Sequence, residues 1–293
     1  MEGIGIAAAL LSAASWAFGT LMFDRLGKYM APAAITFVKG SISLLLMVVI
    51  MACTGGFSPL SWQSYVLLAI SGIVGIAIGD TLFFKSLSDL GAKTQVLFFL
   101  LGQIMTMLLS FLLLDERLTL LQYVGAFILL AGVVIVTWGK QEGHPNKGRG
   151  ICFGLLSILC FSMSSIVLKY SVAEIDAVPA TFYRMLFGTV GILFVGVTSR
   201  NLRSWVAPLR QTKVLGAFML NVVVITLGGF LLSTVAIKNI SVSLASVLST
   251  TEPIFVLLFA ALIWSDKATR RELLGAAVTI GGLLIIMLHE SLC

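Results

Sequence analysis

Charged side chains are scarce in this chain of 293 residues: only 11% are Asp, Glu, Lys or Arg, whereas 59% are hydrophobic. Soluble domains carry about 25% charged residues, so this chain has too little polar surface to face water. Its main solvent must therefore be lipid. The formal net charge of +6 then reflects membrane topology and contact with anionic lipids, and it does not indicate a nucleic-acid partner.

Cysteine and histidine are also rare, and they are spread along the chain without a close CxxC pair: Cys53, Cys152, Cys160, Cys293, His144 and His289. This spacing predicts no metal site, no cofactor and no disulfide framework. A membrane-embedded hydrolase would need a nucleophile beside a base, or a pair of metal ions, and no such constellation is present. The chain is therefore not predicted to be an enzyme.

The two halves of the sequence resemble each other. At an offset of 145 residues, Gly5-Ile6 aligns with Gly150-Ile151; beyond a short insertion near residues 200–205 the offset becomes 150, and Gly79 aligns with Gly229. A cleaved signal would not be duplicated, so the first apolar stretch is predicted to be a spanning helix. The pattern indicates one duplicated membrane unit.

Ten apolar stretches of about 18 to 25 residues have the length of membrane-spanning helices and are too long for barrel strands. They cover residues 3–23, 32–52, 63–85, 93–114, 120–139, 150–170, 177–198, 213–237, 241–264 and 272–289. Because five is odd, the second half must enter the membrane in the opposite sense. The predicted fold is an all-α integral membrane protein with two inverted five-helix repeats, residues 1–145 and 146–293, joined by a hinge at 140–150.

Lysine and arginine are concentrated in the loops that follow odd-numbered spans, as with Arg25, Lys140 and Arg203, and are sparse in the other loops. Because basic residues are retained in the cytoplasm, this asymmetry places both termini outside the cytoplasm.

Few ionisable residues lie well inside the predicted spans: Lys39, Asp80, Arg184 and Glu252. Each is costly in lipid and should face the protein interior or an aqueous cavity. Two interpretations are open. The four residues form structural ion pairs, Lys39 with Asp80 and Arg184 with Glu252; or some line a substrate cavity, where Arg184 holds a substrate carboxylate and Asp80 or Glu252 carries a coupling proton.

Each half of the chain has a helix-weakening residue, a proline or a glycine, next to a polar side chain at a corresponding place. Pro253 follows Glu252 and cannot donate the helical hydrogen bond to the carbonyl of Ser249, while Gly102 precedes Gln103 in the first half. Matched weak points in two repeats are a sequence indicator of a transport site. We therefore predict that Gln103, Ser249 and Glu252 line the cavity; an ordinary kinked helix is the alternative.

Two aromatic residues are further candidates for the cavity wall. Trp16 lies too deep in the first span to be an interfacial anchor, and Tyr183 precedes Arg184. A simple packing role is the alternative for Trp16.

With these residues in view, the chain resembles the drug/metabolite transporter superfamily and its EamA-type members over nearly its whole length. The matching features are Glu252-Pro253, the segment 114–119 (LDERLT), Gly125 with Gly132, and Arg184. The resemblance implies a cavity surrounded by helices one, three, four, six, eight and nine, with helices five and ten at the periphery. It also implies cytoplasmic termini, against the charge distribution. The first helix lacks the embedded glutamate of four-helix multidrug relatives.

The sequence thus predicts a secondary transporter in the cell membrane that exports small organic metabolites, such as amino acids or drugs, by alternating access. Protons are a candidate coupling ion, and a complete duplicated unit needs no oligomeric partner. A flippase for lipids or lipid-linked metabolites could use the same fold. A structural scaffold would leave the buried charges unexplained.

Overall fold

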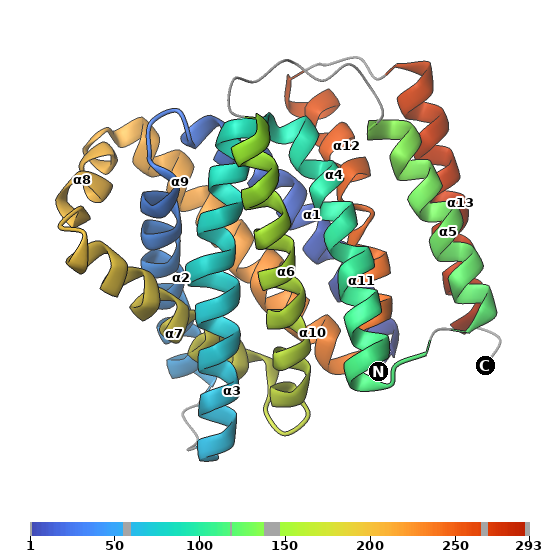
Figure 1. The fold of residues 1–293 in the computed structure, drawn as a ribbon, viewed down its shortest axis with the longest axis horizontal. Helices are drawn as coiled ribbons and strands as arrows, with labels where there is room; N and C mark the ends of the chain where they lie inside the picture. The colour runs from blue at the N-terminus through green and yellow to red at the C-terminus, as the bar shows by residue number, and fades with distance from the viewer. Residues whose placement is uncertain (1, 55–59, 118, 138–146, 265–268, 291–293) are drawn as a thin grey trace.

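The computed structural model describes residues 2–54, 60–117, 119–137, 147–264 and 269–290, and every regular element in these ranges is helical. The elements are α1 (Glu2–Leu26), α2 (Pro32–Thr54), α3 (Trp62–Gly72), η1 (Ile73–Asp80), α4 (Thr81–Leu114), α5 (Leu120–Thr137), α6 (Lys147–Val172), α7 (Ala177–Thr198), α8 (Leu202–Val206), η2 (Ala207–Arg210), α9 (Thr212–Val224), η3 (Ile225–Leu231), α10 (Leu232–Asn239), α11 (Val242–Ser249), α12 (Glu252–Trp264) and α13 (Arg270–Glu290). The all-α prediction is confirmed for this part of the chain (Figure 1).

Seven helical segments within the described ranges are long and apolar enough to cross a membrane. Three shorter apolar helices, Leu101–Leu114, Leu120–Gly132 and Leu273–Ile285, accompany them. The protein is therefore a multi-pass membrane protein, while the count of ten spans stays a prediction. Most of the predicted hinge at 140–150 lies outside the described residues.

The predicted break between the third and fourth spans is a bend within α4 and not a loop. The Ser86 hydroxyl donates a hydrogen bond of 2.7 Å to the side-chain oxygen of Gln95. Residues nine apart in a straight α-helix are separated by roughly 13.5 Å along the axis, which is beyond the reach of these two side chains. The chain must therefore turn sharply between them.

Two π-helical segments interrupt long helices at similar places in the two halves. η1 lies between α3 and α4, and η3 lies between α9 and α10. Both are rich in small residues, with the sequences IVGIAIGD and ITLGGFL. A π-helix replaces the normal backbone ladder and is often found at functional sites. These two segments bring Asp80 and Phe230 to the middle of the helix bundle.

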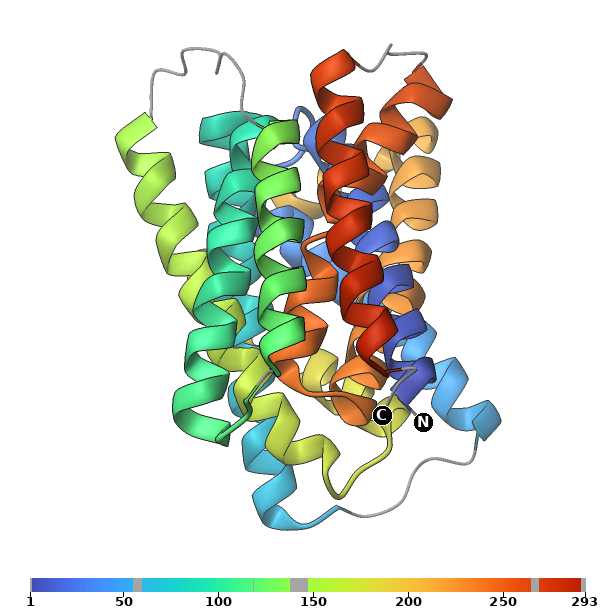
Figure 2. The same cartoon turned by 90° about the vertical axis from the view of Figure 1, so that its right-hand side faces the viewer.

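Helices α5 and α13 lie side by side at one edge of the bundle, as Figures 1 and 2 both show. Glycine allows their close approach: a Cβ atom on Gly132 would lie 2.4 Å from the backbone nitrogen of Thr279, and one on Gly282 would lie 2.5 Å from that of Leu129. Small residues of this kind let membrane helices associate through van der Waals contact. The peripheral position of this pair agrees with the resemblance.

The remaining helices of the two predicted repeats pack mainly across the boundary between them. Helix α4 packs along α6, α2 along α7, and α1 against α10, η3, α11 and α12. Glu116, at the end of α4, accepts hydrogen bonds of 3.1 Å from the backbone N–H groups of Val242 and Ser243, which begin α11. It thereby caps a helix of the other half. The two halves of the chain are thus interlocked and enclose a common centre.

Candidate functional site: a cavity between the two halves

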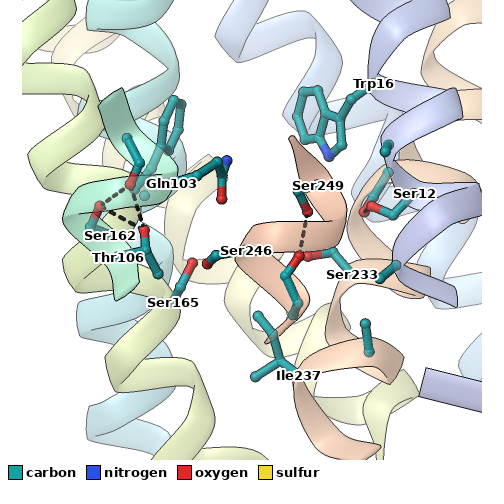
Figure 3. A pocket seen from close by; sticks show the side chains of 18 of the residues that line it. Ser12, Trp16, Gln103, Thr106, Ser162, Ser165, Ser233, Ile237, Ser246 and Ser249 are labelled. Carbon is teal, nitrogen blue, oxygen red and sulfur yellow. Dashed lines mark hydrogen bonds between the residues drawn. The ribbon is translucent and has the colours of Figure 1, made fainter. Parts of the chain in front are cut away.

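A cavity of about 140 Å³ lies at the centre of the bundle, with walls contributed by helices of both halves (Figure 3). Its volume is similar to that of cavities that hold a benzene-sized molecule. Most of the sequence-predicted site residues line it: Trp16, Asp80, Gly102, Gln103, Arg184, Ser249 and Glu252. The structure thus brings together residues that are up to 236 positions apart, from Trp16 to Glu252.

Lys39 and Asp80 form a buried ion pair at the edge of the cavity, with side chains that are 1% and 2% exposed. Lys39 projects from α2 and Asp80 ends η1. The ammonium group of Lys39 also lies 4.8 Å from the centre of the Phe230 ring and 5.7 Å from that of Trp16. The ion pair and the aromatic faces together compensate for its burial. This is the pairing that the first interpretation predicts for these two residues.

Arg184 on α7 contributes a guanidinium group to the same cavity, and it is only 8% exposed. One terminal nitrogen donates a hydrogen bond of 3.0 Å to the hydroxyl of Ser164, while Nε has no hydrogen-bond partner. Asp80 attracts Arg184 electrostatically without contacting it. Arg184 and Glu252 form no ion pair in the described structure, so the predicted pairing of these two residues is wrong.

Gly75 in η1 explains how the guanidinium group reaches its position. A Cβ atom on Gly75 would lie 2.3 Å from the Ser164 hydroxyl and 3.1 Å from a terminal nitrogen of Arg184. Only glycine leaves room for both groups at this point. The backbone of η1 therefore packs directly against the Arg184–Ser164 hydrogen bond.

Glu252 borders the cavity at an interruption between two helices. Helix α11 ends at Ser249 and α12 begins at Glu252, because Pro253 cannot continue the backbone ladder. The Glu252 side chain is 5% exposed; Oε1 accepts a hydrogen bond of 3.2 Å from the hydroxyl of Thr20, and Oε2 has no hydrogen-bond partner. The predicted weak point at Glu252-Pro253 thus corresponds to a real break in the helix.

The matching weak point predicted at Gly102 is wrong, because α4 continues through it. The Gly102 carbonyl accepts hydrogen bonds from the hydroxyls of Thr106 at 2.9 Å and Ser162 at 3.2 Å. These side chains form a hydroxyl cluster on the α4 and α6 side of the cavity, beside Gln103 (Figure 3). The Gly102 carbonyl thus accepts side-chain hydrogen bonds while α4 continues past it.

Tyr183 is the predicted site residue that the structure places elsewhere. Its ring packs at 90° against Tyr65, with 5.1 Å between the ring centres, and it is not among the residues that line the cavity. On α7, Arg184 faces the cavity, whereas its sequence neighbour Tyr183 is turned toward Tyr65. The expectation that Tyr183 lines the cavity is wrong, and its ring has a packing role.

Thr20 and Phe230 are among the cavity residues that were not predicted. Phe230 packs edge-on against Trp16 at 5.1 Å, and Thr20 binds Glu252. Threonine and phenylalanine are common in apolar spans, so their identity carries little information. The sequence signal that could have indicated this part of the cavity is the glycine-rich stretches around Gly79 and Gly229, which coincide with η1 and η3.

Comparison with known proteins agrees with this architecture. The model of the EamA-like transporter family matches residues 3–138 and again 148–288. The chain belongs to the EamA-like transporter family. It is thus a membrane transporter, which acts within a lipid bilayer on a small-molecule substrate, and membership of this family points to transport and not to catalysis.

Individual relatives share about a quarter of their residues with this EamA-like chain. The uncharacterized transporter sll1164 of Synechocystis sp. is 25% identical over 233 residues, which are 77% of this chain and 66% of that protein. The uncharacterized transporter YyaM of Bacillus subtilis is 24% identical over 266 residues, 87% of this chain and 84% of that protein. One crystal structure superposes with a TM-score of 0.76 at 19% identity, over 98% of both chains, which shows a common fold.

Proposed function

We propose that this protein is a secondary transporter that exports small organic metabolites, such as amino acids or drugs, across the cytoplasmic membrane by alternating access. The observation that carries the proposal is the central cavity, in which Arg184 and Glu252 are buried and each keeps an atom without a hydrogen-bond partner. Buried polar groups are normally satisfied, and charged ones are costly inside a membrane. Buried charged groups that border a cavity and still have an unpartnered atom are suited to binding a polar solute.

Alternating access requires the two halves to move relative to each other around the site. Both π-helical segments contribute residues that line the cavity, Asp80 from η1 and Phe230 from η3. A π-helical turn is a place where the ladder of hydrogen bonds can rearrange by one residue. We propose that the repeats rock about these two segments.

Glu252 is the better of the two candidates for carrying a coupling proton, and Asp80 is the other. Asp80 is held by Lys39, so protonating it would break a buried ion pair. Glu252 has no cationic partner in the described structure and makes one hydrogen bond, with Thr20. It can gain or lose a proton without disrupting such a pair.

The size of the cavity favours a small solute over a lipid. Its volume of about 140 Å³ is too small for the acyl chains of a phospholipid, although it would hold a molecule of a few carbon and nitrogen atoms. A flippase is therefore the weaker alternative. Uptake of lipid in the absence of solute transport would favour it.

The test is transport of a panel of amino acids and drugs in proteoliposomes, with and without a pH gradient. We expect at least one water-soluble solute to be transported, with stimulation by the gradient in wild type and none in Glu252→Gln. Glu174→Gln is the matched control, because Glu174 is exposed. Equal, gradient-independent transport by the wild type and by Glu252→Gln would refute proton coupling through Glu252. Absence of transport for every solute would refute the proposed function.

A further inference from the structure

The charged groups around the cavity are not all equivalent. Lys39 and Asp80 neutralise each other through direct contact. Arg184 instead donates its hydrogen bond to a neutral hydroxyl, and Glu252 accepts its hydrogen bond from another neutral hydroxyl. One cationic and one acidic side chain therefore remain without a contacting counter-charge.

These two side chains meet the cavity from different helices, Arg184 from α7 and Glu252 from α12. They are not in ion-pair contact, and both border the same cavity, so each is open to a charged group of a bound solute. Each also retains an unpartnered atom, Nε of Arg184 and Oε2 of Glu252. A planar guanidinium group binds a carboxylate through two parallel hydrogen bonds, and a carboxylate accepts hydrogen bonds from an ammonium group.

We propose that the substrate is a small zwitterion, whose acidic group binds Arg184 and whose ammonium group binds Glu252. This inference rests on the proposed function and specifies the substrate class of the same site. A solute with only a positive charge would leave Arg184 without a contacting negative group. A solute with only a negative charge would leave Glu252 without a contacting positive group. A zwitterion supplies both partners and adds no net charge to a site inside the membrane.

The rest of the cavity wall fits the uncharged part of such a molecule. Trp16 and Phe230 provide an aromatic surface beside Arg184, whose guanidinium carbon lies 5.9 Å from the Phe230 ring centre. Ser246 and Ser249 contribute hydroxyl groups from α11 (Figure 3). The site can therefore accept side chains that are partly apolar and partly hydroxylated.

Ligand-induced thermal stabilisation of the purified protein in lipid nanodiscs tests this inference without depending on transport. The probes are a panel of neutral amino acids, each with the amine that lacks its carboxylate and the carboxylic acid that lacks its amino group. We expect the best-binding amino acid to bind at least about tenfold more tightly than either analogue, because each analogue loses one charge-assisted interaction. Equal stabilisation by the three members of every set, or no stabilisation by any amino acid, would overturn the inference.

Two variants assign the charges to residues. Arg184→Gln should bind an amino acid and its amine equally, and Glu252→Gln should bind an amino acid and its carboxylic acid equally. The exposed residues Arg203 and Glu174 give the matched controls Arg203→Gln and Glu174→Gln, which should keep the wild-type preference. An unchanged preference in the folded Arg184 and Glu252 variants would refute the assignment. If Arg184→Gln does not fold, Arg184→Lys retains the charge, and it should lose part of the carboxylate preference.

The outcomes separate this inference from the proposed function. Transport of solutes without preference for zwitterions would refute the inference and leave the transporter intact. Preferential binding of zwitterions without transport of any of them in proteoliposomes would refute the proposed function and leave the binding site intact.

Discussion

The buried pair of Lys39 and Asp80 should be the most strongly coupled pair of charges in the described structure. Both side chains are almost fully buried, at 1% and 2% exposed. Removing one member of a buried pair leaves an uncompensated charge and costs about 3–5 kcal/mol of unfolding free energy. Arg184 makes the two members unequal, because it repels Lys39 and attracts Asp80.

Asp80→Asn should therefore lower the unfolding free energy more than Lys39→Met does. The first variant leaves two buried cations near each other, whereas the second leaves Asp80 with Arg184 as a nearby counter-charge. The double variant removes both charges of the pair and should recover at least about 2 kcal/mol relative to the sum of the single variants. The recovery should be incomplete, because Arg184 still loses the attraction of Asp80.

The assay is a double-mutant cycle from denaturant unfolding in mixed micelles, followed by tryptophan fluorescence. The matched control is the ion pair of Lys238 with Asp176, whose side chains are 33% and 86% exposed. Exposed pairs contribute little, so its coupling energy should be below about 1 kcal/mol. A coupling energy for Lys39 and Asp80 as small as that of the control, or a smaller loss in Asp80→Asn than in Lys39→Met, would refute this reasoning.

Three further predictions follow from contacts elsewhere. Gly75→Ala should lower the unfolding free energy by about 1–3 kcal/mol, since the new methyl group would displace the Ser164 hydroxyl, and denaturant unfolding measures this loss. Glu116→Gln should cost about 1–2 kcal/mol in the same assay, because the charge-assisted cap of α11 is weakened; no loss would show that the cap is unimportant. Asp89→Asn should cost about 1–2 kcal/mol in the same assay, because Asp89 is only 7% exposed and accepts two charge-assisted hydrogen bonds from Arg149, at 2.8 and 2.7 Å; an unchanged unfolding free energy would contradict this.

The broad architecture could be predicted because the signals for it extend over many residues. A low charge content and long apolar stretches give membrane helices, and repeated glycines reveal the duplication. The buried charges could also be found, since Lys39, Asp80, Arg184 and Glu252 are exceptional inside spans and are all buried. Residue type alone was sufficient to select them.

The details of the site depend on helix rotation and backbone register, which residue types do not determine. Tyr183 and Arg184 are adjacent, yet the helix directs them to different surroundings. The π-helical form of η1 is not evident from its apolar sequence, and neither is the close packing of Gly72 against α7 and of Gly75 against Ser164. Gly102 was expected to weaken a helix, but α4 continues through it, and its position shows no glycine-specific break.

Accessibility of Ser249 from the two sides of the membrane would test the central claim, that this cavity is the transport pathway. In a chain whose native cysteines are replaced, Ser249→Cys would be treated with a membrane-impermeant maleimide from each face of oriented vesicles. Ser204→Cys, at an exposed position on α8, is the control and should react from one face only. Alternating access predicts that the cysteine at position 249 reacts from both faces. Reaction from a single face, or from neither, would contradict it.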